Sequence, residues 1–175
     1  LSGELLSSDL PDWPTKRRWA RQAFDALADQ GYQLTSGVTA ARDLNKTSFV
    51  YRDSLWGGAD MLGLGVSAFS HVGGTHYQND KDIAQFTERI ARGELAIQRG
   101  YVMSPEERMT REAVLLLKTG RLDLSRLRSR HGLDPMAHFS ATFNALVHQG
   151  LATLEAEQLT LTRDSLLQVD RLLPA

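Results

Sequence analysis

Cysteine is absent from the 175 residues of this sequence. A chain without thiols forms no disulfide, and it supplies no thiolate ligand to a zinc site or to an iron–sulfur cluster. Any metal centre that needs such ligands has to take them from residues other than these.

An excess of charge and a long apolar run are also missing. The net charge is -1, with acidic and basic residues interspersed, so the chain offers no general attraction to nucleic acid or to an anionic membrane. No apolar run is long enough to span a bilayer, and the N-terminus lacks the basic and apolar regions of a signal peptide. We expect a cytoplasmic, monomeric protein with neither a nucleic-acid nor a membrane partner.

The length and composition allow one core of ordinary size, or one small domain plus part of another. The chain begins at Leu1 instead of Met and ends abruptly at Ala175. We therefore expect it to be a fragment of a longer protein.

The most distinctive stretch is the apolar run of residues 60–70, which Gly63 and Gly65 interrupt. This run predicts a buried strand that leads into a loop, where the glycines let another group come close to the backbone. Such a loop at the end of a strand is suited to binding a cofactor. The pattern is equally typical of a tightly packed β-turn-β element. Periodicity alone leaves both interpretations open.

The first part of the chain predicts alternating helix and strand. Asp12-Trp13-Pro14 suits a helix start with Pro in the first turn. Residues 15–30 carry apolar side chains at helical spacing and stop at Gly31, and residues 32–36 alternate as a strand does. Residues 40–47 indicate a loop and residues 48–52 a short strand. This order is typical of an α/β fold with a layered or barrel sheet.

The second part predicts mostly helices. A helix capped by Asn79 or Asp80 should end near Gly93, and residues 94–103 should cross over. Ser104 is the expected N-cap of the next helix, with Pro at its first position and a capping-box Glu. The remaining elements are a helix to about 118, helices at 124–131 and 136–148, a two-stranded ribbon at 151–162 and a last helix. Three helices and a ribbon indicate a winged-helix-like module.

A winged helix suggests DNA binding, with the third helix in the major groove. Groove entry requires exposed Arg or Lys, and residues 135–149 contain neither. The pattern therefore disfavours a nucleic-acid-binding function.

The string ADMLGLGVSAFSHVGGTHYQN at residues 59–79 resembles the late-barrel segment of oxygen-independent coproporphyrinogen III oxidases and related radical S-adenosylmethionine (SAM) enzymes. In that family a D-x-L-G-x-G-V-S-A-x-S run ends in a Gln-Asn pair after a glycine-containing loop. The resemblance implies an α/β plus α+β fold. Residues 1–80 would be the last part of an incomplete β/α radical SAM barrel, 81–103 a connecting helix and crossover, and 104–175 a winged-helix-like C-terminal cap.

The same resemblance implies the chemistry and the cofactors. SAM and a 4Fe-4S cluster would generate a 5'-deoxyadenosyl radical, and propionates of coproporphyrinogen III would be oxidatively decarboxylated to vinyl groups, with an unknown electron donor. The C-x-x-x-C-x-x-C cluster motif is absent here, so the cluster ligands would lie upstream. The fragment alone should be inactive and hold no catalytic residue.

The resemblance also implies site residues. Gly63, Gly65, Ala68 and Phe69 would contribute to the SAM pocket, although Phe69 could instead be a core residue. Tyr51 and His71 are candidates for the substrate side. The family often has Gln where Tyr51 stands, and a half-buried aromatic of a strand is the other interpretation of Tyr51.

Two alternatives differ in function. A haem chaperone has the same layout, but such relatives usually depart from the Val-Ser-Ala-x-Ser and Gln-Asn pattern kept here. The change at Tyr51 keeps open a radical SAM enzyme for another substrate, such as a methyltransferase. A metal site is not predicted, because His71, His76 and Asp80 fall at no recognised ligand spacing.

Overall fold

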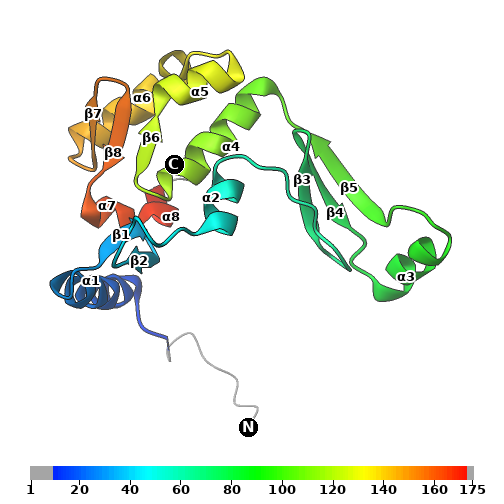
Figure 1. Ribbon diagram of the computed structural model, residues 1–175. Coiled ribbons are helices and arrows are strands. Elements are labelled where there is room, and N and C mark those ends of the chain that lie inside the picture. Colours follow the sequence, from blue (N-terminus) through cyan, green and yellow to red (C-terminus); the bar gives the residue numbers. More distant parts are fainter. Residues whose placement is uncertain (1–9, 173–175) are drawn as a thin grey trace, which may run out of the picture. The chain divides into compact units, whose positions relative to one another are not determined.

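The computed structural model describes residues 10–172 and divides the chain into two compact units (Figure 1). Of the described residues, the first unit comprises 10–48, Leu116–Ser125 and 136–172, and the second comprises Phe49–Leu115 and Arg126–Pro135. No helix within residues 10–172 is long and apolar enough to cross a membrane. Expectations for residues 1–9 and 173–175 lie outside the described part.

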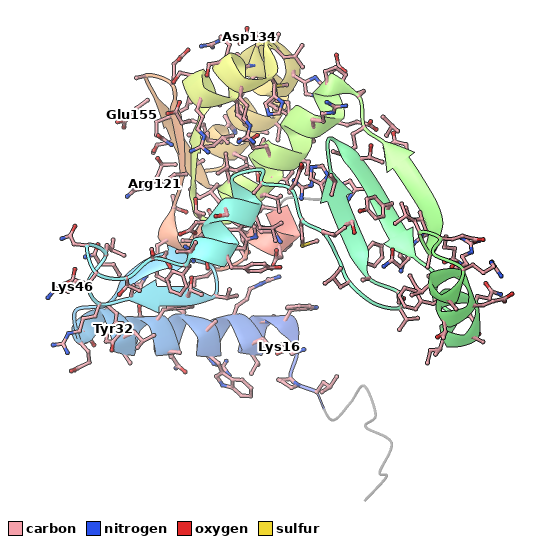
Figure 2. The ribbon with its side chains drawn as sticks, turned by 45° about the vertical axis from the view of Figure 1, so that its right-hand side comes forward. Lys16, Tyr32, Lys46, Arg121, Asp134 and Glu155 are labelled. Atoms are coloured by element: carbon pink, nitrogen blue, oxygen red, sulfur yellow. The ribbon has the colours of Figure 1, made fainter. Side chains whose placement is uncertain are left out.

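The first unit begins with helix α1, Trp13–Asp29. Asp12 caps it by accepting a hydrogen bond from the Thr15 N–H at 2.9 Å, and a proline occupies the first turn. Gly31 follows at φ +80°, a conformation that suits glycine. Lys16 and Tyr32 mark the two ends of this helix in Figure 2. The predicted helix is confirmed, together with its start at residues 12–14.

Strands β1, Gln33–Ser36, and β2, Thr39–Ala41, form a two-stranded antiparallel sheet. The strand after α1 is confirmed, but the α/β step is wrong, because the chain turns back at once instead of crossing over. The turn fits tightly within the unit, since a Cβ on Gly37 would lie 2.6 Å from the Leu166 carbonyl oxygen. Strand β2 also takes the start of the predicted loop.

The second sheet of this unit is antiparallel in the order β6-β8-β7. The ribbon of β7, Ala152–Glu155, and β8, Gln158–Leu161, is confirmed. Strand β6, Arg121–Asp123, was not predicted, because three residues are too few to show alternation. The expected last helix is two short ones, α7 (Arg163–Leu166) and α8 (Val169–Leu172). The buried core includes Leu122, Phe143, Ala152, Leu159, Leu161, Leu166 and Val169.

The second unit opens with helix α2, Val50–Trp56, where a strand was predicted over residues 48–52. The aromatic and β-branched run favours a strand locally, but the Arg52 guanidinium lies over the Phe49 and Trp56 rings, at 4.4 Å and 5.3 Å from their centroids. Phe49 stands three positions before Arg52 and Trp56 four positions after it, a spacing that only a helix brings to one face. The strand prediction is therefore wrong.

The sheet of the second unit is antiparallel in the order β3-β4-β5. Its strands are Phe69–Val72, Thr75–Asn79 and Ile97–Val102. Gly73 and Gly74 have φ of +57° and +78°, which is the type I′ hairpin turn that suits two-residue connections. The strand predicted over residues 60–70 is therefore confined to its last residues, and β5 replaces the predicted crossover at 94–103.

Every strand pair within residues 10–172 is antiparallel. A β/α barrel pairs its strands in parallel. The described residues thus contain mixed helix and antiparallel sheet, and the parallel pairing expected for residues 1–80 is not seen in them.

Helix α3, Ile83–Ala91, is capped by Asp82 and not by Asn79 or Asp80. Those two residues are engaged elsewhere, because Asn79 belongs to β4 and the buried Asp80 pairs with Arg89 at 3.4 Å. Gly93 ends the helix region at φ +73°, as predicted.

Helices α4, Pro105–Leu117, α5, Leu124–His131, and α6, Pro135–His148, are confirmed near their predicted ends. Ser104 and Glu107 form the predicted capping box, in which each backbone N–H donates to the other side chain, at 2.8 and 3.2 Å. Within the second unit, Glu112 of α4 accepts from Arg130 at 3.1 Å and contacts His131 at 2.9 Å. Arg130 also donates to the Gly57 and Gly58 carbonyls that end α2.

The capping box gives a test of stability. Ser104→Ala removes the acceptor of the Glu107 N–H, and we expect the free energy of unfolding to fall by about 1 kcal/mol and the Tm by about 2–4 °C. Thermal and urea unfolding followed by circular dichroism measure both. Ser104→Asp keeps a capping oxygen and is the control. Equal stability of Ser104→Ala and wild type would contradict the role of the cap.

Candidate functional site

A loop of residues 62–68 leaves the edge of the β3-β4-β5 sheet and returns to it. Met61 and His71 form an isolated antiparallel bridge, with reciprocal N–H to C=O hydrogen bonds of 2.7 and 2.8 Å. The chain re-enters the sheet at Phe69, the first residue of β3. We call residues 62–68 the glycine loop. Both of its ends are fixed by backbone pairing.

Two side-chain amides of β4 hold the interior of the glycine loop. Asn79 donates from Nδ2 to the Gly65 carbonyl at 2.9 Å and to the Gly63 carbonyl at 3.4 Å. Gln78 donates from Nε2 to the Ser67 carbonyl at 3.2 Å. The Gln-Asn pair of the sequence motif therefore acts as a clamp on the loop backbone.

Further contacts support this clamp. Arg99 of β5 donates from Nε to Gln78 Oε1 at 3.0 Å, which orients the buried amide. The Ser67 N–H donates to the Asp80 carbonyl at 2.8 Å, and Ser67 adopts φ +63°. A non-glycine residue in this conformation is uncommon and persists where its surroundings hold it.

The two loop glycines are needed for different reasons. A Cβ on Gly63 would lie 2.2 Å from the Phe69 carbonyl oxygen, and the Gly63 N–H donates to Ser70 Oγ at 2.9 Å. Gly65 has φ +96°, and nothing lies within 4 Å of a Cβ built there. The backbone that approaches Gly63 closely is thus the chain's own, whereas Gly65 faces open space.

Apolar side chains around the loop point to solvent. Leu64 is 84% exposed and Phe69 56% exposed, so the alternative that Phe69 is a core residue is wrong. Ala68 is half-buried, and its carbonyl accepts from the Asn79 N–H at 2.9 Å. The second unit therefore presents an ordered loop with exposed apolar groups, suited to the packing of a flat ring.

Tyr51 lies beside the start of this loop. It belongs to α2, is largely exposed, and its hydroxyl donates to Met61 Sδ at 3.6 Å. The interpretation of Tyr51 as a half-buried strand aromatic is wrong. Helix α2 brings the Tyr51 hydroxyl to the start of the glycine loop. The sequence showed that Tyr51 precedes this loop, but not how its side chain is oriented.

His71 is buried in β3, 7% exposed, and its Nδ1 has no hydrogen-bond partner among residues 10–172. Its ring centroid lies 4.6 Å from that of His76, the residue opposite on β4. Burial first, and then the positive charge of Arg111, lowers the pKa of both imidazoles; His76 and Arg108 lower that of His71 further, whereas Asp60 raises it. Both rings are therefore neutral at pH 7.

No group of three or more His, Cys, Asp or Glu side chains in residues 10–172 is arranged to hold a metal ion.

The whole fold is similar to that of a radical SAM enzyme. The coproporphyrinogen III oxidase HemN from Escherichia coli, described as a radical SAM enzyme, superposes with a TM-score of 0.76 and 22% identity. The match covers 97% of this chain and 42% of that chain. No family model matches the sequence.

Curated relatives carry one name, oxygen-independent coproporphyrinogen III oxidase. The Pseudomonas aeruginosa protein is 30% identical over 98% of this chain, and the Bradyrhizobium diazoefficiens protein 25% identical over 89%. The Escherichia coli K12 protein is 23% identical over 91% of this chain. The resemblance to this family is therefore confirmed. The chain spans only 42%, 38% and 38% of the lengths of these three relatives.

The amide clamp can be tested by hydrogen exchange. Asn79→Ala removes two hydrogen bonds to the glycine loop, and we expect the Ser67 and Ala68 amides to exchange about 10-fold faster, because each bond contributes about 1 kcal/mol. Exchange measured by NMR reports these amides one by one. Asn45→Ala, at an exposed position of the first unit, should leave them unchanged. Unchanged exchange in Asn79→Ala would show that the backbone contacts suffice.

The pKa of His71 predicts a pH dependence. A histidine whose pKa is lower in the folded state binds fewer protons there than in the unfolded state. The contribution of His71 to stability is therefore complete above pH 6.5, the ordinary pKa of histidine, and is lost as the pH falls toward the lower pKa of the folded state. We expect the free energy of unfolding to fall in this window and the fall to be smaller in His71→Gln. Urea unfolding between pH 7.5 and 5 measures the slope. The exposed His148→Gln is the control, and an equal slope in His71→Gln would contradict the assignment.

Proposed function

We propose that this chain forms part of an oxygen-independent coproporphyrinogen III oxidase and supplies one wall of its SAM pocket. The observation that carries the proposal is the glycine loop, whose clamped backbone and exposed apolar groups coincide with the motif that resembles this family. The shared name of the curated relatives supports the substrate.

The finer description of the fold belongs to the same proposal. The order α4, β6, α5, α6, β7, β8 is that of a winged-helix-like module, and we propose this role for residues 104–175. Residues 1–80 would adjoin the end of the barrel, with 81–103 as the connection. These boundaries, a cytoplasmic location and a monomeric state stay predictions.

The residues of the loop fit a bound SAM molecule. Open space at Gly65 leaves room for a ligand beside the backbone, and Phe69 offers an exposed ring where the loop re-enters the sheet. Gly63 and Ala68 would act indirectly, since both are engaged in holding the loop and β3 together. When bound, SAM and a 4Fe-4S cluster would supply the one-electron chemistry. The cluster ligands would come from other residues, because this chain has no cysteine.

In the proposed reaction a propionate side chain loses CO₂, one proton and two electrons and becomes a vinyl group, and the proton and both electrons would be taken up when SAM is cleaved to methionine and 5'-deoxyadenosine. This chain's part would be to bind and to orient. Tyr51 offers a phenol at the start of the glycine loop, and the neutral His71 of β3 offers an uncharged, buried ring nitrogen. The exposed apolar residues would exclude water once a flat substrate lies against them.

The first test is the coding sequence upstream of Leu1. We expect a C-x-x-x-C-x-x-C motif there, and anaerobic reconstitution of that protein with iron and sulfide should release CO₂ from coproporphyrinogen III in a SAM-dependent reaction. An initiating Met close upstream with no cysteine, or a reconstituted protein that cleaves SAM but leaves the tetrapyrrole unchanged, would overturn the proposal.

In the reconstituted protein, Phe69→Ala should raise the SAM concentration needed for half-maximal activity about 10-fold, because it removes the contact area of one aromatic ring. Val102→Ala changes another exposed apolar residue of the same sheet and is the control. Equal SAM dependence of the two variants would place the SAM contact elsewhere.

A further inference from the structure

A cluster of positive charge lies beside the β3-β4 hairpin, because the Arg108 guanidinium packs on Gly74 in the hairpin turn and Arg111 stands one helical turn further along the same face of α4. Arg111 of α4 acts electrostatically on both His71 and His76, and Arg108 of the same helix acts on His71. All four residues belong to the second unit. The cluster was not apparent in the sequence, because the arginines follow the histidines by more than 30 positions.

Arg111 lacks a counter-charge in direct contact. Its side chain makes no hydrogen bond or ion pair within residues 10–172, and burial lowers its pKa, opposed by the neighbouring Glu112. The oxygens of Glu112 are occupied by Arg130 and His131. A half-buried guanidinium without a bonded partner is unfavourable, because desolvation penalises the charge.

The neighbouring charged groups do not neutralise the positive charge around Arg111. The guanidinium of Arg108 packs on Gly74, where a Cβ would come within 2.4 Å, and its Nε donates to the Met103 carbonyl at 3.2 Å. Asp60 is the carboxylate that acts on His71, and it accepts from the Gly73 N–H at 3.1 Å. Two guanidiniums thus face one carboxylate, which leaves a net positive charge.

His71 completes the set of donors, and His76, whose ring already makes a hydrogen bond with the Ser70 backbone, lies beside it with ring centroids 4.6 Å apart. His71 Nδ1 is buried and unpartnered, so this polar atom also lacks the hydrogen bond that buried groups normally make. A neutral imidazole can donate one N–H, and a guanidinium can donate several to one anion. An incoming anion would therefore satisfy both the unpartnered charge and the unpartnered nitrogen.

We propose that Arg111, His71 and His76 form a binding site for the carboxylate of a small molecule, and, resting on the function proposed above, that this carboxylate is a propionate of the tetrapyrrole. Guanidinium groups match the planar shape of a carboxylate with two parallel N–H donors. Such a site would hold a substrate side chain by its charge, beside the hairpin that carries the glycine loop.

NMR of the 175-residue chain tests the site without measuring enzyme activity. Sodium propionate is titrated while the ring signals of His71 and His76 and the Nε–H signal of Arg111 are followed, with sodium chloride and sodium phosphate at equal ionic strength. We expect propionate to shift all three signals with saturation and to raise the apparent pKa of both histidines. Chloride should cause only small, unsaturated changes.

Variants assign the effect to Arg111. Arg111→Gln should weaken propionate binding about 10-fold or more, since a charge-assisted hydrogen bond contributes at least one factor of ten. Arg111→Lys should retain part of it, and Arg92→Gln, which changes an exposed arginine of the same unit, should retain all. If Arg111→Gln does not fold, the wild-type selectivity of propionate over chloride decides the question.

Methionine distinguishes the two sources of a carboxylate, because its ammonium group, as in SAM, should be repelled by the guanidiniums. Weaker binding of methionine than of propionate supports the propionate assignment. Equal or tighter binding of methionine, or preference for phosphate, overturns it. Propionate shifts no larger than those of chloride overturn the site itself, while the proposed function is judged separately by CO₂ release from the reconstituted protein.

Discussion

The glycine loop depends on the hydrogen bonds from the side-chain amides of Gln78 and Asn79 to its backbone carbonyls. A loop of small and apolar residues has no core of its own, so its conformation has to be held by neighbouring polar groups. Both amides stand at adjacent positions of β4, and β5 orients one of them through Arg99. The shape of the candidate cofactor surface is thus set by a strand outside the loop.

This arrangement changes the meaning of the Gly-Leu-Gly motif. One glycine admits the carbonyl of Phe69, and the other provides a left-handed turn next to open space. Gly63 therefore serves the internal packing of the chain, and Gly65 leaves space for a ligand. Such a division explains how an exposed apolar loop can stay ordered before any ligand binds.

Electrostatics on the hairpin complements the loop. His71 and His76 are influenced electrostatically by Arg111, a half-buried guanidinium on α4 that has no bonded counter-charge in the described part of the chain. Apolar contacts at the loop suit a ring, whereas this cluster suits an acid group. The tetrapyrrole proposed as substrate would offer both a ring and acid groups.

Local signals in the sequence determined most helix boundaries and the family resemblance. Helix caps such as Asp12 and Ser104 bind a backbone N–H only three residues further on, and a glycine that ends a helix does so by its own φ angle. Both signals can therefore be recognised in the sequence without knowledge of the fold. The 21-residue match at residues 59–79 identified the family because backbone-specific glycines and amides recur at fixed spacing. The β7-β8 ribbon was visible for the same reason, since alternation is a local pattern.

Only the tertiary structure decided the features that depend on distant partners. Residues 48–52 have strand propensity, but Arg52 binds two rings that a helix brings together, so α2 forms and turns Tyr51 toward Met61. Strand β5 exists because β4 offers it an edge, and the fold of the second unit brings Arg111 near enough to His71 to lower the pKa of its imidazole. Pairing, burial and charge between residues far apart in the chain leave no local pattern, and for that reason they could not be predicted from the sequence.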